Sequence, residues 1–409
     1  MTVRGLFVAL VAALLLGACT PATDEAPSTR WIAAWTSPPS PFLPGGRSAY
    51  LEPYADQTLR QVLRVDADGD ELRVRFTNEL GTPALEIGAA SLGRAAADGT
   101  VQGEFMPITF DGRRSVVIPP AAMMLSDPVR MPVARFDDLV IDTYFPEPTR
   151  PTGHRHWVEL SASGNHTGDA EWPGQKRVRG ATAVSSIQVR SATAHRLVVA
   201  FGDSITEGAG ATAGAHKSWP SQLSRRLADS QSDDWTVVNA GISGNRVLHD
   251  GGSQNGLARF DRDALSIAGV TDIVLLEGIN DLGVAFALDN ARDVVDADDL
   301  ILAFRQMIER AHLRGVRVFG ATIMPYEGAV YYAPAGETER TRVNDWIRNG
   351  GAFDGVIDLD AVMRDPKDPE RLTQGYEIGD HLHPGDAGYA AMAEAVAAFL
   401  ERAATDTAR

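Results

Sequence analysis

Residues 197–208 read LVVAFGDSITEG, and this stretch decides the fold of the second half of the chain. Its apolar, partly β-branched beginning predicts a short strand buried in a parallel sheet. Gly202 permits a tight turn at the strand end, and Asp203 or Ser204 can cap a helix that begins near Ile205. Ser204 would then lie where backbone amides favour developing negative charge. A purely capping role for Ser204 is the alternative interpretation.

Two more polar blocks follow strand candidates. Residues 239–245, NAGISGN, come after the candidate at 235–238, and residues 278–281, GIND, come after the candidate at 272–276. Glycines on both sides of the serine in the first block let the backbone turn sharply and aim amides outward. Asn280 lies just past a strand end, where open α/β sheets place ligands, and its side chain can donate to an oxyanion. Ordinary turns are the alternative for both blocks.

The fourth block, DHLHP at residues 380–384, precedes a C-terminal helix. The spacing of Asp380 and His383 lets the carboxylate meet the imidazole, fix its tautomer and stabilise its charged form. Asp380, His381 and His383 could also bind a metal, but no further cluster with ligand spacing supports that interpretation. A third alternative is a surface histidine, since the chain has nine histidines.

Together the four blocks supply a hydroxyl nucleophile, oxyanion donors, a base and an orienting carboxylate, which acyl transfer requires. The G-x-S-x-G pattern of α/β-hydrolases occurs nowhere in the chain, which favours a different scaffold with the same chemistry.

The blocks resemble those of the SGNH hydrolase superfamily, the GDSL esterases and lipases, over roughly Ala194 to Leu400. A β-rich leader before such a domain resembles the bacterial secreted branch of that family. The resemblance implies a nucleophilic Ser204, a basic His383 oriented by Asp380, and an oxyanion hole formed by backbone N–H groups of Ser204 and Gly244 with the side chain of Asn280. It implies no cofactor and no metal. Isoleucine stands at position 205 where the family nickname has leucine.

Strand and helix patterns alternate from residue 191 to 409, the expected catalytic domain. The expected strands are 197–201, 235–238, 272–276, 316–322 and 355–358, and the expected helices include 217–228, 298–314 and 385–403. Such alternation predicts a three-layer α/β/α, flavodoxin-like sheet of order 2-1-3-4-5. Its switch point lies beside the first strand, from which Ser204 emerges.

Residues 31–190 look β-rich and predict a β-sandwich, jelly-roll-like domain. The alternating runs 58–65 and 71–77 are joined by DADGD at 66–70, which predicts a hairpin. Residues 115–118 and 139–145 are further strand candidates. Such a domain can bind carbohydrate or can pack against a catalytic domain, and packing is the favoured interpretation.

The beginning of the chain has the pattern of a lipoprotein signal peptide, residues 1–18. Arg4 precedes a short apolar run, and LGAC at 16–19 resembles a lipobox with Cys19, the chain's single cysteine, as the lipidated residue. Residues 19–30 would form a flexible tether. We expect an exported protein that is lipid-anchored through Cys19 to the bacterial cell envelope, with the outer membrane as its destination, or is extracellular. A plain secretory signal is the alternative.

The formal charge of −16 opposes nucleic-acid binding. The expected partner is a small ester or acylated saccharide, and the candidate residues lining its site are Arg246, Met324, Tyr326, Tyr331 and Tyr332. The tyrosines could equally pack their own loop. The leading hypothesis is removal of acetyl or other short acyl groups from saccharides or aryl esters. The alternatives are a lipase or thioesterase for longer chains, an O-acyltransferase, and a glycan-binding surface lipoprotein without activity.

Overall fold

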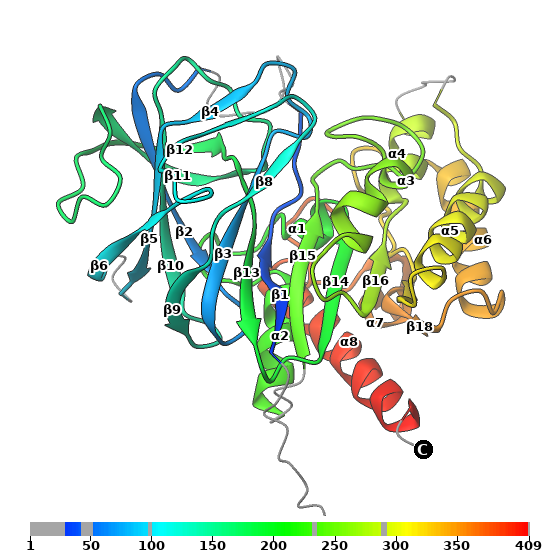
Figure 1. Ribbon diagram of the computed structural model, residues 1–409. Coiled ribbons are helices and arrows are strands. Elements are labelled where there is room, and N and C mark those ends of the chain that lie inside the picture. Colours follow the sequence, from blue (N-terminus) through cyan, green and yellow to red (C-terminus); the bar gives the residue numbers. More distant parts are fainter. Residues whose placement is uncertain (1–28, 42–51, 97–99, 231–234, 288–292, 408–409) are drawn as a thin grey trace, which may run out of the picture.

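The computed structural model describes residues 29–41, 52–96, 100–230, 235–287 and 293–407. Cys19, the expected signal peptide and most of the expected tether therefore lie outside the described residues. Figure 1 shows a β-rich part built by the first half of the chain beside an α/β part built by the second half. None of the described helices is long and apolar enough to cross a membrane.

The β-rich part contains two antiparallel sheets that face each other. The five-stranded sheet comprises β1 (Arg30–Thr36), β13 (Val184–Ser191), β3 (Gly69–Thr77), β8 (Met123–Leu125) and β9 (Val129–Val133). The six-stranded sheet has the order β12 (Gly174–Ala181), β11 (Arg155–Ser163), β2 (Gln57–Arg64), β10 (Asp138–Phe145), β5 (Ala89–Ala95) and β6 (Val101–Ile108). A small pair, β4 (Leu85–Ile87) and β7 (Val116–Ile118), completes the β-sandwich.

The faces of the two sheets that meet are apolar, because alternate side chains along each strand point to the same face. Leu72, Val74 and Phe76 on β3 are fully buried, whereas Arg73 and Arg75 on the other face are only partly buried. Period-2 alternation of this kind gives one face to the core and the other to solvent or to a neighbour. The predicted β-sandwich is thus confirmed.

The predicted hairpin between 58–65 and 71–77 is wrong, because β2 and β3 belong to different sheets. The physical reason is Asp66, whose buried carboxylate accepts the N–H of Val237 at 2.7 Å and the hydroxyl of Ser224. Both donors belong to the α/β part. They hold the turn at the interface, so the chain passes from one sheet to the other instead of folding back on itself.

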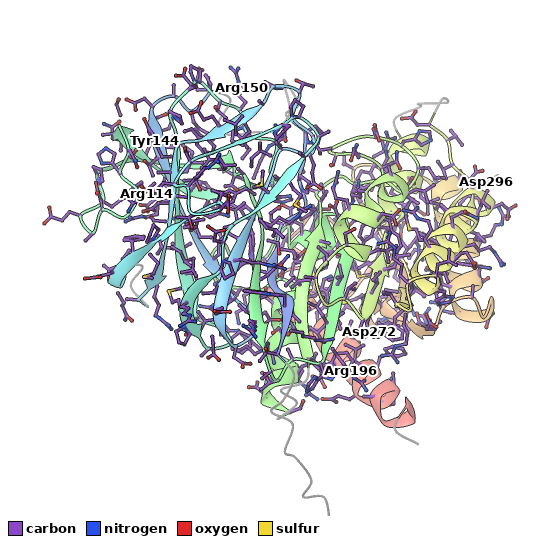
Figure 2. The ribbon with its side chains drawn as sticks, in the orientation of Figure 1. Arg114, Tyr144, Arg150, Arg196, Asp272 and Asp296 are labelled. Carbon is purple, nitrogen blue, oxygen red and sulfur yellow. The ribbon has the colours of Figure 1, made fainter. Side chains whose placement is uncertain are left out.

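The α/β part has a five-stranded parallel sheet in the order β15-β14-β16-β17-β18, which is the predicted 2-1-3-4-5 order. The strands are β14 (Arg196–Gly202), β15 (Trp235–Gly241), β16 (Asp272–Leu276), β17 (Arg317–Ala321) and β18 (Gly355–Ile357). Arg196 and Asp272, labelled in Figure 2, mark the amino ends of two of them. The carboxyl ends therefore gather at the opposite edge, where the polar blocks begin.

Helices cover both faces of this sheet (Figure 1). The helices are α1 (Ser204–Glu207), α2 (Trp219–Asp229), α3 (Gly256–Phe260), the π-helix η1 (Asp261–Leu265), α4 (Ile279–Ala287), α5 (Ala297–His312), α6 (Pro334–Asn349), α7 (Leu359–Met363) and α8 (Asp386–Thr407). Helix α2 packs with α8, and α5 packs with α6. A two-stranded ladder, β19 (Arg364–Asp365) with β20 (Asp368–Leu372), precedes the fourth block. The predicted α/β/α fold is confirmed.

The two parts are joined by hydrogen bonds along β1. The N–H of Ala33 donates to the carbonyl of Ala268 at 2.9 Å, and the hydroxyl of Thr36 donates to the carbonyl of Asn239 at 2.8 Å. In Figure 1, β1 lies beside β15. The β-rich part therefore packs directly against the strand that leads into the second polar block.

Candidate active site

Ser204 is the first residue of α1, immediately after β14. The N–H of Ile205 donates to the Asp203 carboxylate at 2.9 Å, so Asp203 caps this helix and the Ser204 hydroxyl is left for another partner. Gly202 is required at the turn, since a Cβ there would lie 2.6 Å from the carbonyl oxygen of Leu276. Ser204 Oγ lies 2.9 Å from Nε2 of His383. The purely capping interpretation of Ser204 is therefore wrong.

His383 is held by Asp380, three residues earlier on the same loop. Its Nδ1 lies 2.6 Å from Asp380 Oδ2, and its backbone N–H donates to Oδ1 at 2.9 Å. Partial burial works to raise the pKa of Asp380, but the hydrogen bonds from His383 and Leu382 outweigh it and lower that pKa. An ionised Asp380 accepts Nδ1–H and leaves Nε2 free to accept the Ser204 proton.

His381 does not join this arrangement. Its Nδ1 faces Glu377 Oε1 at 3.5 Å, and its backbone is in the left-handed region with φ 60°. Within the described ranges, no group of three or more His, Cys, Asp or Glu side chains could hold a metal ion. Asp380 is committed to His383, so the metal alternative has no support in this loop.

The expected oxyanion donors lie on three separate blocks. Gly244 has φ 73° in a turn, and its N–H makes no hydrogen bond to any described residue. The N–H of Ser204, at the first position of α1, has no acceptor within its own helix. Asn280 Nδ2 donates to the carbonyl of Asn245 at 2.9 Å and only weakly to Asp203 Oδ2, at 3.4 Å. One amide hydrogen of Asn280 is therefore available to a stronger acceptor.

Tyr331 fixes the orientation of that amide. Its hydroxyl donates to Asn280 Oδ1 at 3.3 Å, which keeps Nδ2 on the side of Asn245 and Asp203. Burial raises the pKa of Tyr331 well above its usual value, so the hydroxyl remains a donor. Of the residues expected to line the substrate, Tyr331 is thus the one that contacts an expected site residue.

Three of the other residues expected to line the site are engaged elsewhere, whereas Met324 lines a small cavity with Asp203 and Leu382. Tyr326 is fully buried against the rings of Tyr331 and Tyr332, so it packs the loop and cannot line an open pocket. Tyr332 donates to Glu370 at 2.8 Å. Arg246 is buried and pairs with Asp293 at 2.8 Å.

A fully buried arginine that the sequence did not reveal ties the blocks together. Arg259 donates to the carbonyl of Gly202 at 2.8 Å, to the carbonyl of Ala240 at 2.8 Å and to Asn245 Oδ1 at 2.6 Å. It also donates to Glu277 Oε1 at 3.1 Å. One guanidinium thus fixes the carboxyl ends of β14 and β15 and the start of the third block, using the fork of donors that only Arg offers.

Three carboxyl groups are buried beneath the nucleophile. Burial raises the pKa of Asp203 to about 7 and that of Asp281 to about 6, and it raises the pKa of Glu277 well above its usual value. Asp281 accepts the N–H groups of Val247 and Leu248 at 2.7 and 3.1 Å, which ties the third block to the segment that follows the second. The charge of these three carboxyl groups therefore depends on pH, and they lie buried close to Ser204.

Glu207, one turn after Ser204, connects the site to the β-rich part. Its Oε2 accepts the N–H of Ser243 at 2.5 Å, next to Gly244. Its Oε1 lies 3.2 Å from His154 Nε2 and 3.1 Å from a guanidinium nitrogen of Arg179. Burial works to raise the pKa of Glu207, but His154, Ser243 and Arg179 outweigh it and lower that pKa to about 2. Nothing in the sequence distinguished this glutamate from an ordinary helix residue.

The fold and this arrangement define a three-layer α/β/α hydrolase domain preceded by a β-sandwich. Residues 200–391 match the GDSL-like Lipase/Acylhydrolase family, and this part of the chain belongs to that family. The protein is accordingly an enzyme of the carboxylic ester hydrolase class, of the SGNH/GDSL type.

Solved structures that the chain matches include the lipase/acylhydrolase from Enterococcus faecalis and a GDSL-like lipase from Bacteroides thetaiotaomicron VPI-5482. The first is 21% identical, covers 50% of this chain and 95% of its own, and has a TM-score of 0.40. The second is 19% identical, covers 51% of this chain and 89% of its own, and has a TM-score of 0.36. No curated protein matches the chain.

Proposed function

We propose that the protein is a serine esterase that removes acetyl or other short acyl groups from saccharides or aryl esters. The observation that carries the proposal is the continuous hydrogen-bonded line from Ser204 Oγ through His383 to Asp380, with separations of 2.9 and 2.6 Å. This is the geometry that activates a hydroxyl nucleophile.

In the first step, His383 Nε2 takes the Ser204 proton as Oγ attacks the ester carbonyl. The N–H groups of Ser204 and Gly244 and Nδ2 of Asn280 hold the tetrahedral oxyanion. His383 then gives its proton to the departing alcohol, which leaves an acyl-serine. In the second step, His383 activates a water that attacks the acyl carbonyl, and the acid departs with regeneration of Ser204.

The preference for a short acyl group rests on the sequence. No long apolar run near the four blocks predicts a tunnel for the acyl chain that a lipase or thioesterase would take.

A substrate panel with a catalytic blank tests the proposal. Acetylated sugars, aryl acetates and p-nitrophenyl esters of increasing chain length are assayed with the wild type and with Ser204→Ala. We expect activity to be highest on acetyl esters and to be lost in the variant. Equal hydrolysis by Ser204→Ala would exclude Ser204 as the nucleophile. Product analysis with a sugar acceptor separates the esterase from the O-acyltransferase alternative.

We further propose that the enzyme works outside the cytoplasm, tethered through a lipid on Cys19. This rests on the sequence of residues 1–30. Labelling with radioactive palmitate in a bacterial host should mark the wild type and not Cys19→Ser. Labelling of both proteins, or of neither, would exclude acylation at this residue.

A further inference from the structure

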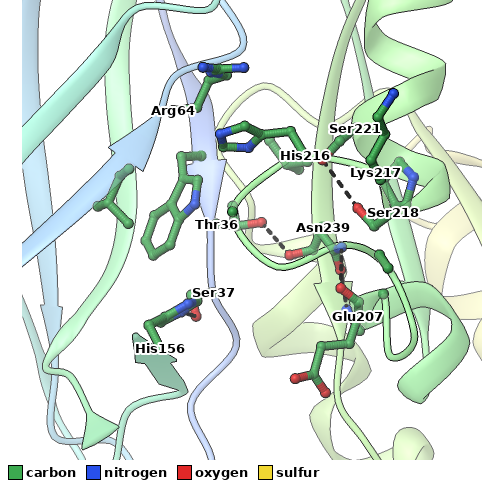
Figure 3. A pocket seen from close by; sticks show the side chains of 18 of the residues that line it. Thr36, Ser37, Arg64, His156, Glu207, His216, Lys217, Ser218, Ser221 and Asn239 are labelled. Carbon is green, nitrogen blue, oxygen red and sulfur yellow. Dashed lines mark hydrogen bonds between the residues drawn. The ribbon is translucent and has the colours of Figure 1, made fainter. Parts of the chain in front are cut away.

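A cavity of about 600 Å³ lies between the β-rich part and the α/β part. Figure 3 shows side chains from both parts meeting across it. One wall is the outer face of the six-stranded sheet, and the other is the segment 207–218 together with the start of α2. The lining also includes Gly241 and Ser243 of the second block, so the cavity shares a wall with the loop that carries Gly244.

One residue of the cavity lining packs against the loop that carries His383. Gly210 lines it, and a Cβ at Gly210 would lie 2.7 Å from the carbonyl oxygen of Pro384, the residue after His383. Thr212, also in the lining, donates through its N–H to Asp386 at 2.8 Å. A molecule in the cavity therefore rests on segments that directly support both Ser204 and His383.

The cavity is basic although the whole chain is acidic, with a formal charge of −16. Its lining has five cationic side chains and two carboxylates; the cations are Arg64, Arg155, Arg179, Lys217 and Arg225, and the carboxylates are Asp66 and Glu207. Burial raises the pKa of Asp66, which further weakens the negative charge. A local excess of positive charge against an acidic surface concentrates anions at this place.

Arg155 is one of the cations in this lining whose side chain has no hydrogen-bond acceptor among the described residues. Arg64 pairs with Asp138 at 2.7 Å, and Arg179 pairs with Glu207 at 3.1 Å. Arg155 is half-buried, yet it makes no hydrogen bond or ion pair with any residue in the described ranges. Burial and, to a smaller extent, the neighbouring Arg179 lower the pKa of Arg155, and the charge of Glu207 offsets only part of this effect. A half-buried guanidinium has donors that an anionic ligand would satisfy.

Trp157 supplies an aromatic surface beside Arg155. The two are separated by one residue on β11, so their side chains leave the same face of the sheet, about 7 Å apart along the strand. Trp157 is 52% exposed, and Val62 on the adjacent strand is 50% exposed. Arg177 lies over the Trp157 ring, 5.3 Å from its centroid, so the opposite face of the ring is the one suited to stacking on a sugar or an aryl group.

We infer that this cavity binds a carboxylate-bearing saccharide, with its carboxylate on Arg155 and its ring on Trp157, and thereby selects acidic glycan esters for Ser204. The inference rests on the proposed function for its link to Ser204. A single guanidinium fork matches the two oxygens of a carboxylate in a bidentate pair. The two side chains together favour a sugar acid over a neutral sugar.

Binding is measured first, with catalysis removed. Calorimetry with Ser204→Ala compares an unesterified oligogalacturonate with a neutral xylo-oligosaccharide and a sulfated oligosaccharide of the same length. We expect the oligogalacturonate to bind best and to bind more weakly as ionic strength rises. Arg155→Gln should weaken that binding by about 10- to 100-fold, the range for loss of a charged hydrogen bond. Arg114→Gln, exposed on the β-rich part (Figure 2), is the matched control and should change nothing.

Selectivity is measured second. The ratio of kcat/KM on an acetylated oligogalacturonate to kcat/KM on an acetylated xylo-oligosaccharide should exceed one and should fall in Arg155→Gln. Trp157→Ala, an exposed position that does not endanger folding, should weaken binding of both saccharides. Unchanged binding and selectivity in Arg155→Gln would overturn the inference, and so would preference for the sulfated saccharide. Failure of wild-type protein to hydrolyse p-nitrophenyl acetate would instead contradict the proposed function, because that small neutral ester does not need the cavity.

Discussion

Asp380 holds His383 through two hydrogen bonds, from the imidazole Nδ1 at 2.6 Å and from the backbone N–H at 2.9 Å. The two residues are three apart, so one short loop sets both the position and the tautomer of the base. This spacing of three residues is why the sequence could predict that the carboxylate meets the imidazole, while the four blocks taken together predicted its role.

Asp380→Asn should lower kcat on p-nitrophenyl acetate by about 10⁴-fold, because an amide can stabilise the wrong imidazole tautomer and cannot stabilise the imidazolium. KM should change little. Steady-state kinetics with the purified variant give the result, with the exposed Asp345→Asn as control. A loss of less than about tenfold would show that Asp380 does not orient the base.

Asn280→Ala should lower kcat by about 10²- to 10³-fold, the usual effect of removing one oxyanion donor. The variant also loses the bond to Asn245, so thermal unfolding is measured in parallel to separate catalysis from folding. The exposed Asn349→Ala is the control. Full kcat in a folded Asn280→Ala protein would remove this side chain from the oxyanion hole.

Glu207→Gln should reduce kcat by about 10- to 100-fold with little effect on KM for a small ester. The glutamine can still accept from Ser243, but it loses the ion pairs to His154 and Arg179 that fix its position. A small displacement of the Gly244 loop is costly because the oxyanion donors must be placed before the reaction.

A double-mutant cycle with His154→Gln distinguishes positioning by this pair from a general loss of stability. Because Glu207 and His154 act through one contact, the two effects should not add. The exposed Glu104→Gln should behave as wild type. Additive losses in the double variant would mean that the β-rich part does not act on the site through Glu207.

Acid should destabilise the protein partly through Glu207. Its pKa is lowered from 4.5 to about 2 by His154, Ser243 and Arg179. A lowered carboxyl pKa contributes stability that is present above about pH 4.5 and is lost as the pH falls toward 2, amounting to roughly 2–4 kcal/mol. Urea unfolding between pH 6 and pH 3 should therefore show a shallower decline for Glu207→Gln than for wild type. Parallel declines in the two proteins would contradict the assignment.

The order of the parallel sheet could be predicted because apolar runs alternated with helical segments, and the first three runs each led into one of the polar blocks. Helix α6 was missed although Ala333-Pro334 begins it, because its amphipathic pattern is weak and arginines such as Arg340 are buried in ion pairs. The predicted hairpin failed for a related reason. A turn pattern in the sequence predicts only local conformation. The hydrogen-bond partners of Asp66, which determine where the turn lies, belong to the α/β part and are distant in the sequence.

Residues that position the catalytic groups through distant contacts could not be identified from sequence motifs. Tyr331 could be named only as a possible lining residue, because its bond to Asn280 depends on how two loops meet. Glu207 lies within the first block but acts through His154 and Arg179, which belong to the β-rich part. A sequence reveals groups that must be chemically reactive, while groups that position them are recognised from contacts.

Arg259→Lys should destabilise the protein by roughly 3–5 kcal/mol, the range for breaking a buried, hydrogen-bonded charge network. A lysine has one ammonium group and cannot reach the carbonyls of Gly202 and Ala240 and the side chain of Asn245 together. Those acceptors would be left buried and without a hydrogen-bond donor, which lowers the stability further.

Urea unfolding measures the loss of stability, and the exposed Arg114→Lys should stay within about 0.5 kcal/mol of wild type. Since Arg259 also fixes the strand ends that carry the first two blocks, the residual folded protein should show a lower kcat. A stable Arg259→Lys protein with wild-type kcat would show that the strand ends hold the site without this guanidinium.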